Sequence, residues 1–128
     1  YFRDSESGKV QAMYGSQASE ALGRAIFGSY NLFLGMENWL GLANNSADTA
    51  QVQVIVNGPN GSKEEVFSLE ASGSAVLPLH DTERFGTQAD SYGTVELRIT
   101  EGANVFGQIM RLHSSGGAPD FAAPTLAR

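Results

Sequence analysis

The stretch "QVQVIVNGPNGSKEEVFSLE", Gln51–Glu70, contains the pattern that decides the fold. In its first part, Gln51–Asn57, three valines alternate with other residues, which is the period of a strand with one buried face. The segment Gly58–Ser62 consists of residues that form tight turns. A second strand over Glu64–Glu70 follows, so the stretch predicts an antiparallel hairpin.

The remainder of the second half repeats this pattern. "TVELRIT", Thr94–Thr100, shows the clearest alternation in the chain, and "VFGQIMRLH", Val105–His113, follows it. The short segment Glu101–Asn104 between them predicts a hairpin connection. Ala75–His80 is a further strand, and because Pro78 cannot donate a hydrogen bond, we expect it at a sheet edge or strand end.

The first half is less regular. Lys9–Tyr14 has the composition of a short strand, and Ser16–Phe27 has small and apolar residues at helical spacing. A glycine within that segment weakens a helix, so a strand that starts near Arg24 is an alternative. Tyr30–Leu34 and Asn38–Asn44 follow as two extended segments.

Seven to nine short strands, about ten residues apart, indicate an all-β antiparallel sandwich, either immunoglobulin-like or jelly-roll-like. One short helix near the N-terminus is allowed, and Asp81 and Gly86 can bound a single helical turn. We expect an N-terminal extension or strand over residues 1–20, the sandwich over 21–113, and an extended tail over 114–128.

Composition narrows the classes of function. The 128 residues are 41% hydrophobic, enough for one core, and include 15 glycines. The net charge is −6 with 8 basic residues, which argues against nucleic acid and anionic membranes as partners. There is no cysteine, and no apolar run approaches the ~20 residues of a membrane span. Few charges and many turn residues are typical of extracellular β-domains, so we expect an extracellular or cell-surface location.

The aromatic residues and one amide are the candidate ligand or interface residues. Trp39 stands beside glycine and alanine, and we expect it to be an anchor of the core. A sugar-stacking platform is the alternative for Trp39. The other candidates are Tyr14, Tyr30, Tyr92 and Asn38, and the last, like Asn31, is also suited to bonding backbone at a strand start.

No catalytic constellation is evident. His80 and Asp81 are adjacent, but the further ligands of a metal hydrolase are missing at suitable spacing. Ser114, His80 and Asp81 include the residue types of a Ser–His–Asp catalytic triad, but nothing in their spacing favours such a triad. Asp81, Glu83 and Asp90 allow calcium, without a recognised calcium-loop pattern. We therefore predict a protein that is not an enzyme and needs no cofactor, with calcium as an option.

A short internal echo suggests self-association. An apolar residue, an arginine and, five residues later, a glycine occur at Arg3–Gly8 and again at Arg111–Gly116. The chain also starts at Tyr1, which we take as the start of a processed or excised chain. We expect a bacterial repeat unit or filament subunit whose termini or sheet edges pair with a neighbour, for example by adding a strand to its sheet.

From "NWLGLANNSADTAQVQVIVNGPNG" through "FGQIMRLHSS", about 80 residues, the layout resembles the small β-sandwich of the sensory rhodopsin transducer family. The shared features are an apolar strand that ends in asparagine, a polar turn, an alternating strand, a glycine turn and a late strand with arginine. It also resembles sandwich modules that recur in bacterial surface proteins. The resemblance implies a sandwich and an oligomeric habit, and it transfers no functional residue.

The combined expectation is a non-enzymatic extracellular structural or adhesion module that self-associates. The alternative is a carbohydrate-binding module that uses exposed aromatic side chains.

Overall fold

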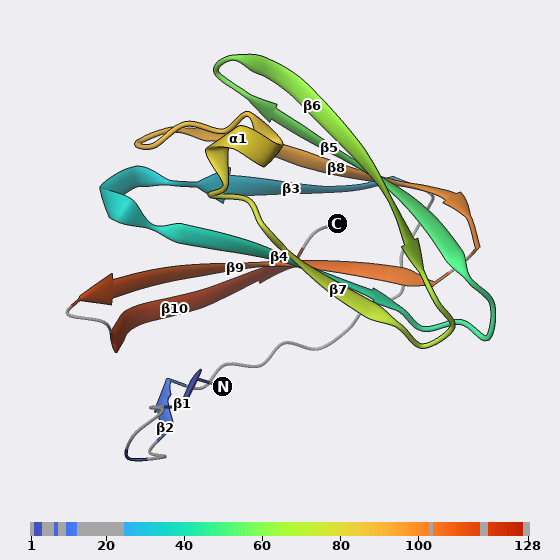
Figure 1. The fold of residues 1–128 in the computed structure, drawn as a ribbon, viewed down its shortest axis with the longest axis horizontal. Helices are drawn as coiled ribbons and strands as arrows, with labels where there is room; N and C mark the ends of the chain where they lie inside the picture. The colour runs from blue at the N-terminus through green and yellow to red at the C-terminus, as the bar shows by residue number, and fades with distance from the viewer. Residues whose placement is uncertain are drawn as a thin grey trace.

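The computed structural model describes the backbone of residues 2–3, 7, 10–12, 25–102, 104–115 and 118–126, and the side chains of residue 7, 25–102 and 104–113. The main strands form two packed antiparallel sheets (Figure 1). The elements in chain order are β1 (Phe2–Arg3), β2 (Val10–Ala12), β3 (Ala25–Asn31), η1 (Phe33–Gly35), β4 (Glu37–Asn44), β5 (Ala50–Gly58), β6 (Gly61–Leu69), β7 (Ser74–Pro78), α1 (Thr82–Phe85), β8 (Tyr92–Glu101), β9 (Val105–Ser115) and β10 (Ala118–Leu126).

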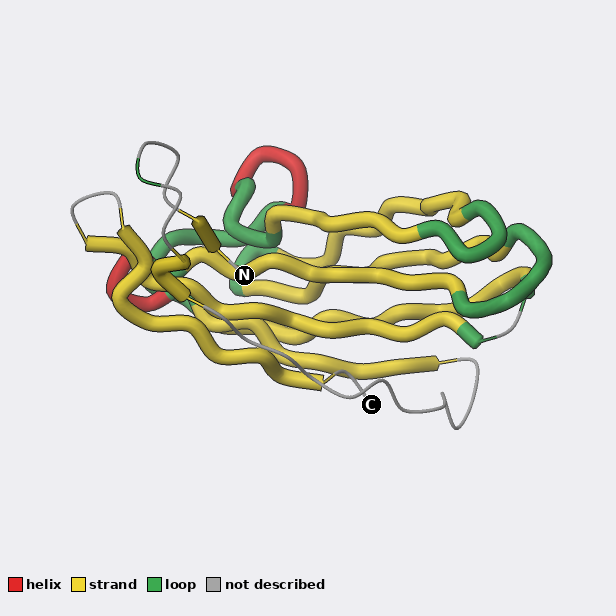
Figure 2. Tube along the Cα trace, turned by 90° about the horizontal axis from the view of Figure 1, so that it is seen from below, coloured by secondary structure: helices red, strands yellow, loops and turns green. Residues whose placement is uncertain are grey.

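One sheet has the strand order β3-β8-β5-β6 and is called the β3 sheet below; the other has the order β10-β9-β4-β7 and is called the β4 sheet. The short strands β1 and β2 pair with each other. In the view turned by 90° the main strands run along the molecule, with connecting loops at both ends (Figure 2). The predicted all-β sandwich is therefore confirmed.

The hairpin of Gln51–Glu70 is confirmed as β5 and β6, whose pairing runs from Ala50 and Leu69 to Gly58 and Gly61. The valines of β5 and the inward residues of β8 form the core on this side, and all are nearly inaccessible. Leu40 and Leu42 of β4, with Ile109 of β9, close the core from the other sheet. The alternation seen in the sequence thus corresponds to the inner and outer faces of the β3 sheet.

The helical turn is also confirmed. The Asp81 carboxylate accepts a hydrogen bond from the backbone N–H of Arg84 at 3.1 Å, which caps α1. Gly86 ends the turn with a φ of 65°, a conformation that glycine adopts without steric cost. Pro78 lies at the end of β7, which is an edge strand as predicted.

Three expectations need correction or extension. Strands β8 and β9 do not form a hairpin, because β8 pairs with β3 and β5 whereas β9 pairs with β4 and β10. Residues expected as a C-terminal tail include β10, which pairs with β9 along the whole strand. A strand begins at Ala25, as the alternative near Arg24 anticipates, and the predicted helix over Ser16–Phe27 otherwise falls outside the described residues.

Trp39 is the main correction, because it is not part of the core. It pairs with Met110 and with Pro78, and these residues lie on the face of the β4 sheet that points away from the β3 sheet. Its neighbours Asn38 and Leu40 are the buried ones. Both faces of β4 carry apolar residues, so alternation alone did not show which face would be covered.

Candidate binding site

The two ends of the sandwich differ, and one of them carries an open groove. Its walls are η1, the turn between β5 and β6, and the start of β8. This end lies at the left of Figure 1, where β3 turns through η1 into β4. The groove encloses about 520 Å³ and is shallow, so it can accept a small part of a larger ligand rather than engulf it.

The groove is rimmed by aromatic side chains from two separate parts of the chain. Phe33 and Tyr92 are stacked, with ring centroids 6.3 Å apart and ring planes 29° apart. They are 42% and 72% exposed, and the adjacent Leu34 is 79% exposed. Large apolar side chains gathered in this way on a soluble surface are typical of a recognition site.

The loops under these rings are fixed by hydrogen bonds. The Asn31 side chain accepts from the N–H of Phe33 at 2.9 Å, and the Asp90 carboxylate accepts from the N–H of Leu34 at 3.1 Å. The N–H of Leu32 donates to the carbonyl of Ser91 at 2.8 Å. Leu34 and Asp90 both have positive φ, at 58° and 51°, which costs free energy in residues with a side chain. The aromatic rim is therefore held in place by its supporting loops.

The floor of the groove depends on glycine. Gly58 and Gly93 line it, and a side chain on either would collide with the ring or hydroxyl of Tyr30. Tyr30 itself is 1% exposed and belongs to the core. Polar side chains of Asn57 and Thr94 lie at the same end, with Asn57 Nδ2 donating to Thr94 Oγ1 at 3.3 Å.

The candidate ligand residues predicted from the sequence differ in their exposure and position in the structure. Tyr92 lies at the groove and is exposed, as an aromatic ligand contact must be. Tyr30 and Asn38 are buried, so neither can be an exposed contact in the described fold. Tyr14 lies outside the described residues.

Asn38 has a structural role. Its Nδ2 donates to the Asn31 carbonyl at 2.7 Å, and its Oδ1 accepts from the Asn31 N–H at 2.8 Å. The amide thus replaces a strand partner at the end of β3 and joins the two sheets. This is the backbone-bonding alternative, which the sequence also allowed for Asn31 and Asn38.

Trp39 lies away from the groove lining. Its ring meets the His80 ring edge-on, with centroids 4.8 Å apart, and Nε1 donates to Glu37 Oε2 at 3.2 Å. His80 Nδ1 lies 3.1 Å from the Asn38 carbonyl. Trp39 and His80 therefore pack on each other on the outer face of the β4 sheet.

Phe33 was missed as a site residue. Its local pattern, in the segment Tyr30–Leu34, indicated only an extended strand, and nothing in the sequence relates it to Tyr92. A cue was present, because Gly35 follows two large apolar residues and its φ is 70° in the structure. Such a glycine favours a turn that presents its neighbours to solvent.

The candidate chemistry at His80, Asp81, Glu83 and Asp90 is not assembled into a site. Asp81 caps α1, and Asp90 binds the N–H of Leu34. Within residues 25–102 and 104–113 there is no group of three or more histidine or acidic side chains that could hold a metal ion. Ser114 has no described side chain. In the same described part of the chain, no helix has the length and hydrophobicity needed to cross a membrane.

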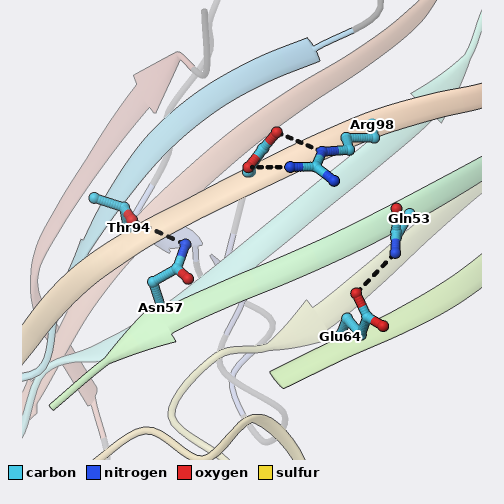
Figure 3. Close-up of polar contacts among 6 residues, drawn as sticks. Gln53, Asn57, Glu64, Thr94 and Arg98 are labelled. Atoms are coloured by element: carbon cyan, nitrogen blue, oxygen red, sulfur yellow. Dashed lines mark hydrogen bonds and ion pairs between the residues drawn. The ribbon is translucent and has the colours of Figure 1, made fainter. Parts of the chain in front are cut away.

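The outer face of the β3 sheet carries polar side chains that bond one another, beside the exposed Phe27 and Val66. Gln53 donates to Glu64 at 2.8 Å, and Arg98 Nε pairs with Glu96 at 2.6 Å (Figure 3). These pairs, with the Asn57–Thr94 bond, cross between neighbouring strands or lie along one strand (Figure 3). Because these polar groups bind one another, this face is less suited than the aromatic rim to recognising a ligand.

Each edge of the two sheets carries a feature that opposes pairing with another strand. β6 has exposed Lys63 and Glu64 and the partly exposed Glu65, and β7 ends in a proline. On β3, Arg111 Nη2 donates to the Ser29 carbonyl at 3.1 Å and to its hydroxyl at 3.2 Å. β10 contains Pro119 and Pro124.

Comparison with known proteins adds support for the fold. No family model matches the chain, and no curated protein matches it. The crystal structure of Thermotoga maritima 1070 is similar to it, with a TM-score of 0.66 at 14% sequence identity. The similarity covers 82% of this chain and 92% of that one. At this identity, the likeness shows a shared fold and nothing about activity.

Proposed function

We propose that the protein is a non-enzymatic, extracellular binding module of the adhesion type that recognises a carbohydrate at the groove. The observation that carries this proposal is the exposed, stacked pair of Phe33 and Tyr92 at its rim. Aromatic rings offer large flat apolar surfaces, and the C–H faces of sugar rings can pack on them with little conformational loss. A shallow groove suits a chain that extends beyond the site.

The loop geometry supports the same function. Leu34 and Asp90 hold strained backbone conformations that are fixed by the bond between the Leu34 N–H and the Asp90 carboxylate. Strain of this kind is concentrated at functional sites, where the surrounding structure maintains it. A rim that is already ordered loses little entropy when a ligand binds.

The polar groups and the charge are also consistent with a sugar. Asn57, Thr94 and Asp90 lie among the groove residues and offer amide, hydroxyl and carboxylate groups to ligand hydroxyls. The net charge of −6 disfavours anionic polymers. A neutral, hydroxyl-rich ligand therefore fits this end of the molecule better than nucleic acid or an acidic polymer does.

A glycan array followed by calorimetry tests the proposal. We expect the protein to retain at least one class of neutral glycan, and Tyr92→Ala to weaken that binding about tenfold or more. Phe33→Ala should act in the same direction. Val76→Ala is the matched control, because Val76 is 63% exposed on β7, outside the groove lining. Binding that responds equally to all three substitutions, or no glycan binding at all, contradicts the proposal.

Self-association of a structural or filament subunit is the second candidate. The observation in its favour is the apolar outer face of the β4 sheet, where Val76 is exposed and Trp39 is half-buried beside the buried Met110. The protected edges argue that copies would meet through this face rather than by strand pairing. Light scattering over a wide concentration range tests this, with Val76→Glu expected to lower the mass of any oligomer. A monomer at every concentration contradicts it.

A further inference from the structure

Asp90 supplies the charge of the groove. Among the residues that line it, Asp90 alone has a side chain that is ionised at neutral pH. The residue is exposed, so its carboxylate can be reached from solvent. In the part of the chain that the structure describes, no basic side chain forms an ion pair with this carboxylate. The groove therefore presents one negative charge that the described fold does not neutralise.

The fold uses only one of the two carboxylate oxygens. Oδ1 of Asp90 accepts from the N–H of Leu34 at 3.1 Å, and the backbone N–H of Asp90 donates to the carbonyl of Leu32 at 3.2 Å. Oδ2 accepts no hydrogen bond from the residues that the structure describes. The two bonds hold Asp90 against η1, in the same groove lining as Phe33 and Tyr92. A second acceptor oxygen is therefore held beside the aromatic rim.

The structural role of Asp90 does not require its charge. An asparagine at this position would offer the same Oδ1 acceptor to the N–H of Leu34. The φ of Asp90 is 51°, in the left-handed region that asparagine also tolerates. The chain already has a net charge of −6, so a further negative charge adds repulsion within the folded protein. The charge of Asp90 is thus not explained by the loop that it supports.

We propose that Asp90 is the specificity-determining residue of the groove, and that its carboxylate makes the groove favour amino sugars over neutral sugars and reject uronic acids. This inference rests on the proposed carbohydrate function and deepens it, because it names the class of sugar. Stacking on Phe33 and Tyr92 recognises an apolar ring face whatever the charge of the sugar. The Asp90 carboxylate accepts stronger hydrogen bonds than a neutral oxygen does, attracts an ammonium group and repels another carboxylate.

Asp90→Asn tests this inference, because it removes the charge and keeps the acceptor for Leu34. NMR titrations at about pH 6, where the amine is protonated and the carboxylates are ionised, would measure affinity for methyl β-glucosaminide, methyl β-glucoside and methyl β-glucuronide. The wild type should bind them in that order, from tightest to weakest. In Asp90→Asn, affinity for the glucosaminide should fall about tenfold and affinity for the glucoside about threefold, so most of the preference is lost.

Two controls accompany this variant. Asp48→Asn removes the same charge from an exposed residue at the other end of the sandwich, and it should leave the three affinities and their order unchanged. Tyr92→Ala should weaken binding of all three glycosides to a similar extent. The melting temperature of Asp90→Asn without ligand should equal or exceed that of the wild type, because the loop keeps its hydrogen bond.

The outcomes distinguish this inference from the function on which it rests. A clear fall in the melting temperature of Asp90→Asn shows that the loop itself needs the charge and overturns the inference. If Tyr92→Ala weakens binding while Asp90→Asn leaves the order of the three glycosides unchanged, or acts no more strongly than Asp48→Asn, the inference is overturned and the carbohydrate function stands. If the wild type binds none of the three, the inference is overturned, and the glycan array decides the carbohydrate function separately.

Discussion

The two ends of β4 carry buried asparagines, and their surroundings show how differently the two ends of the sandwich are built. At the closed end, Asn44 Nδ2 lies within 2.8–3.1 Å of the carbonyls of Asp48, Leu69 and Glu70, and its Oδ1 accepts from the N–H and hydroxyl of Ser46. At the groove end, the Asn38 side chain bonds the N–H and the carbonyl of Asn31 and so takes the place of a strand partner.

The contrast extends to the loops. The closed end joins its connections by backbone bonds, such as the N–H of Asn45 to the Asn104 carbonyl and the N–H of Ser72 to the Ser46 carbonyl. The groove end is also joined by backbone bonds, such as that from the N–H of Leu32 to the Ser91 carbonyl, but it exposes the Phe33 and Tyr92 side chains. The closed end bonds its buried amide within the chain, whereas the groove end leaves two aromatic side chains exposed. The following substitutions test that difference.

Asn44→Ala should have the largest effect on stability. It removes an amide that is 2% exposed and leaves several buried carbonyls without their donor. We expect a loss of about 3 kcal/mol in the free energy of unfolding, measured by urea denaturation. Asn45→Ala, an exposed neighbour, is the control and should change it by less than about 0.5 kcal/mol. Equal effects of the two substitutions would show that the amide does not hold the closed end together.

Gly58→Ala should destabilise the groove end by about 1–3 kcal/mol, because the added methyl group meets the Tyr30 hydroxyl at 2.5 Å. The Tyr30 ring carbon behind it is at 3.8 Å, an ordinary contact. Adding Tyr30→Phe should therefore restore most of the lost stability, and a double-mutant cycle measures this coupling. Additive effects would mean that the hydroxyl does not lie against Gly58.

Leu34→Gly should raise stability by about 0.5–1 kcal/mol, because its φ of 58° strains a residue with a side chain. Ser72 at the closed end has a φ of 57°, so Ser72→Gly is a matched control with a similar expected gain. Thermal unfolding and glycan affinity are measured for both. Only Leu34→Gly should weaken binding, since only that strain supports the rim. A loss of affinity in both variants would remove the distinction between the two ends.

Glu65→Gln should have the smallest effect and a dependence on pH. The hydrogen bond from Arg84 lowers the pKa of Glu65 below its ordinary 4.5, so the carboxylate is stabilised by folding. This contribution is complete above the unfolded pKa and is lost as pH falls through the lowered folded pKa. Both side chains are substantially exposed, which limits it to about 0.5 kcal/mol at pH 7. Urea denaturation at pH 7 and pH 3 measures this contribution, with Glu70→Gln as the control. If the difference in unfolding free energy between the wild type and Glu65→Gln is larger at pH 3 than at pH 7, the stabilisation does not come from the ionised Glu65 carboxylate.

Elements that depend on residues close together in the sequence were predicted correctly, whereas pairing between distant strands was not. The β5–β6 hairpin and the α1 turn depend on residues that are close in the sequence, so both could be predicted from it. A Gly-Pro-Asn-Gly turn indicated the hairpin, and Asp81 and Gly86 indicated the helical turn. A connection that carries the chain from one sheet to the other has no such local sequence signal. The segment after Glu101 has the composition of a tight turn whether β9 returns beside β8 or passes to the β4 sheet, as it does.

The candidate site was predicted only in part for the same reason. Tyr92 could be named as an aromatic candidate, but its neighbour Phe33 comes from a distant segment that η1 turns toward it. Tyr30, Trp39 and Tyr92 could not be ranked by exposure, because Tyr30 and Tyr92 each follow a serine and the residues on both faces around Trp39 are mostly apolar. The structure buries the first, half-buries the second against His80 and exposes the third.

The sequence by itself determined that this chain forms antiparallel strands with tight turns, because alternation and turn chemistry act over a few residues. It also excluded a thiolate site and disfavoured an anionic partner, because those depend on composition. Only the tertiary structure decided that Asn38 and Asn44 lie inside while Trp39 lies outside, and that Phe33 meets Tyr92 over a floor of glycines. The physical reason is that burial and contact depend on how the strands pair and which sheet each joins, and these are properties of the whole fold.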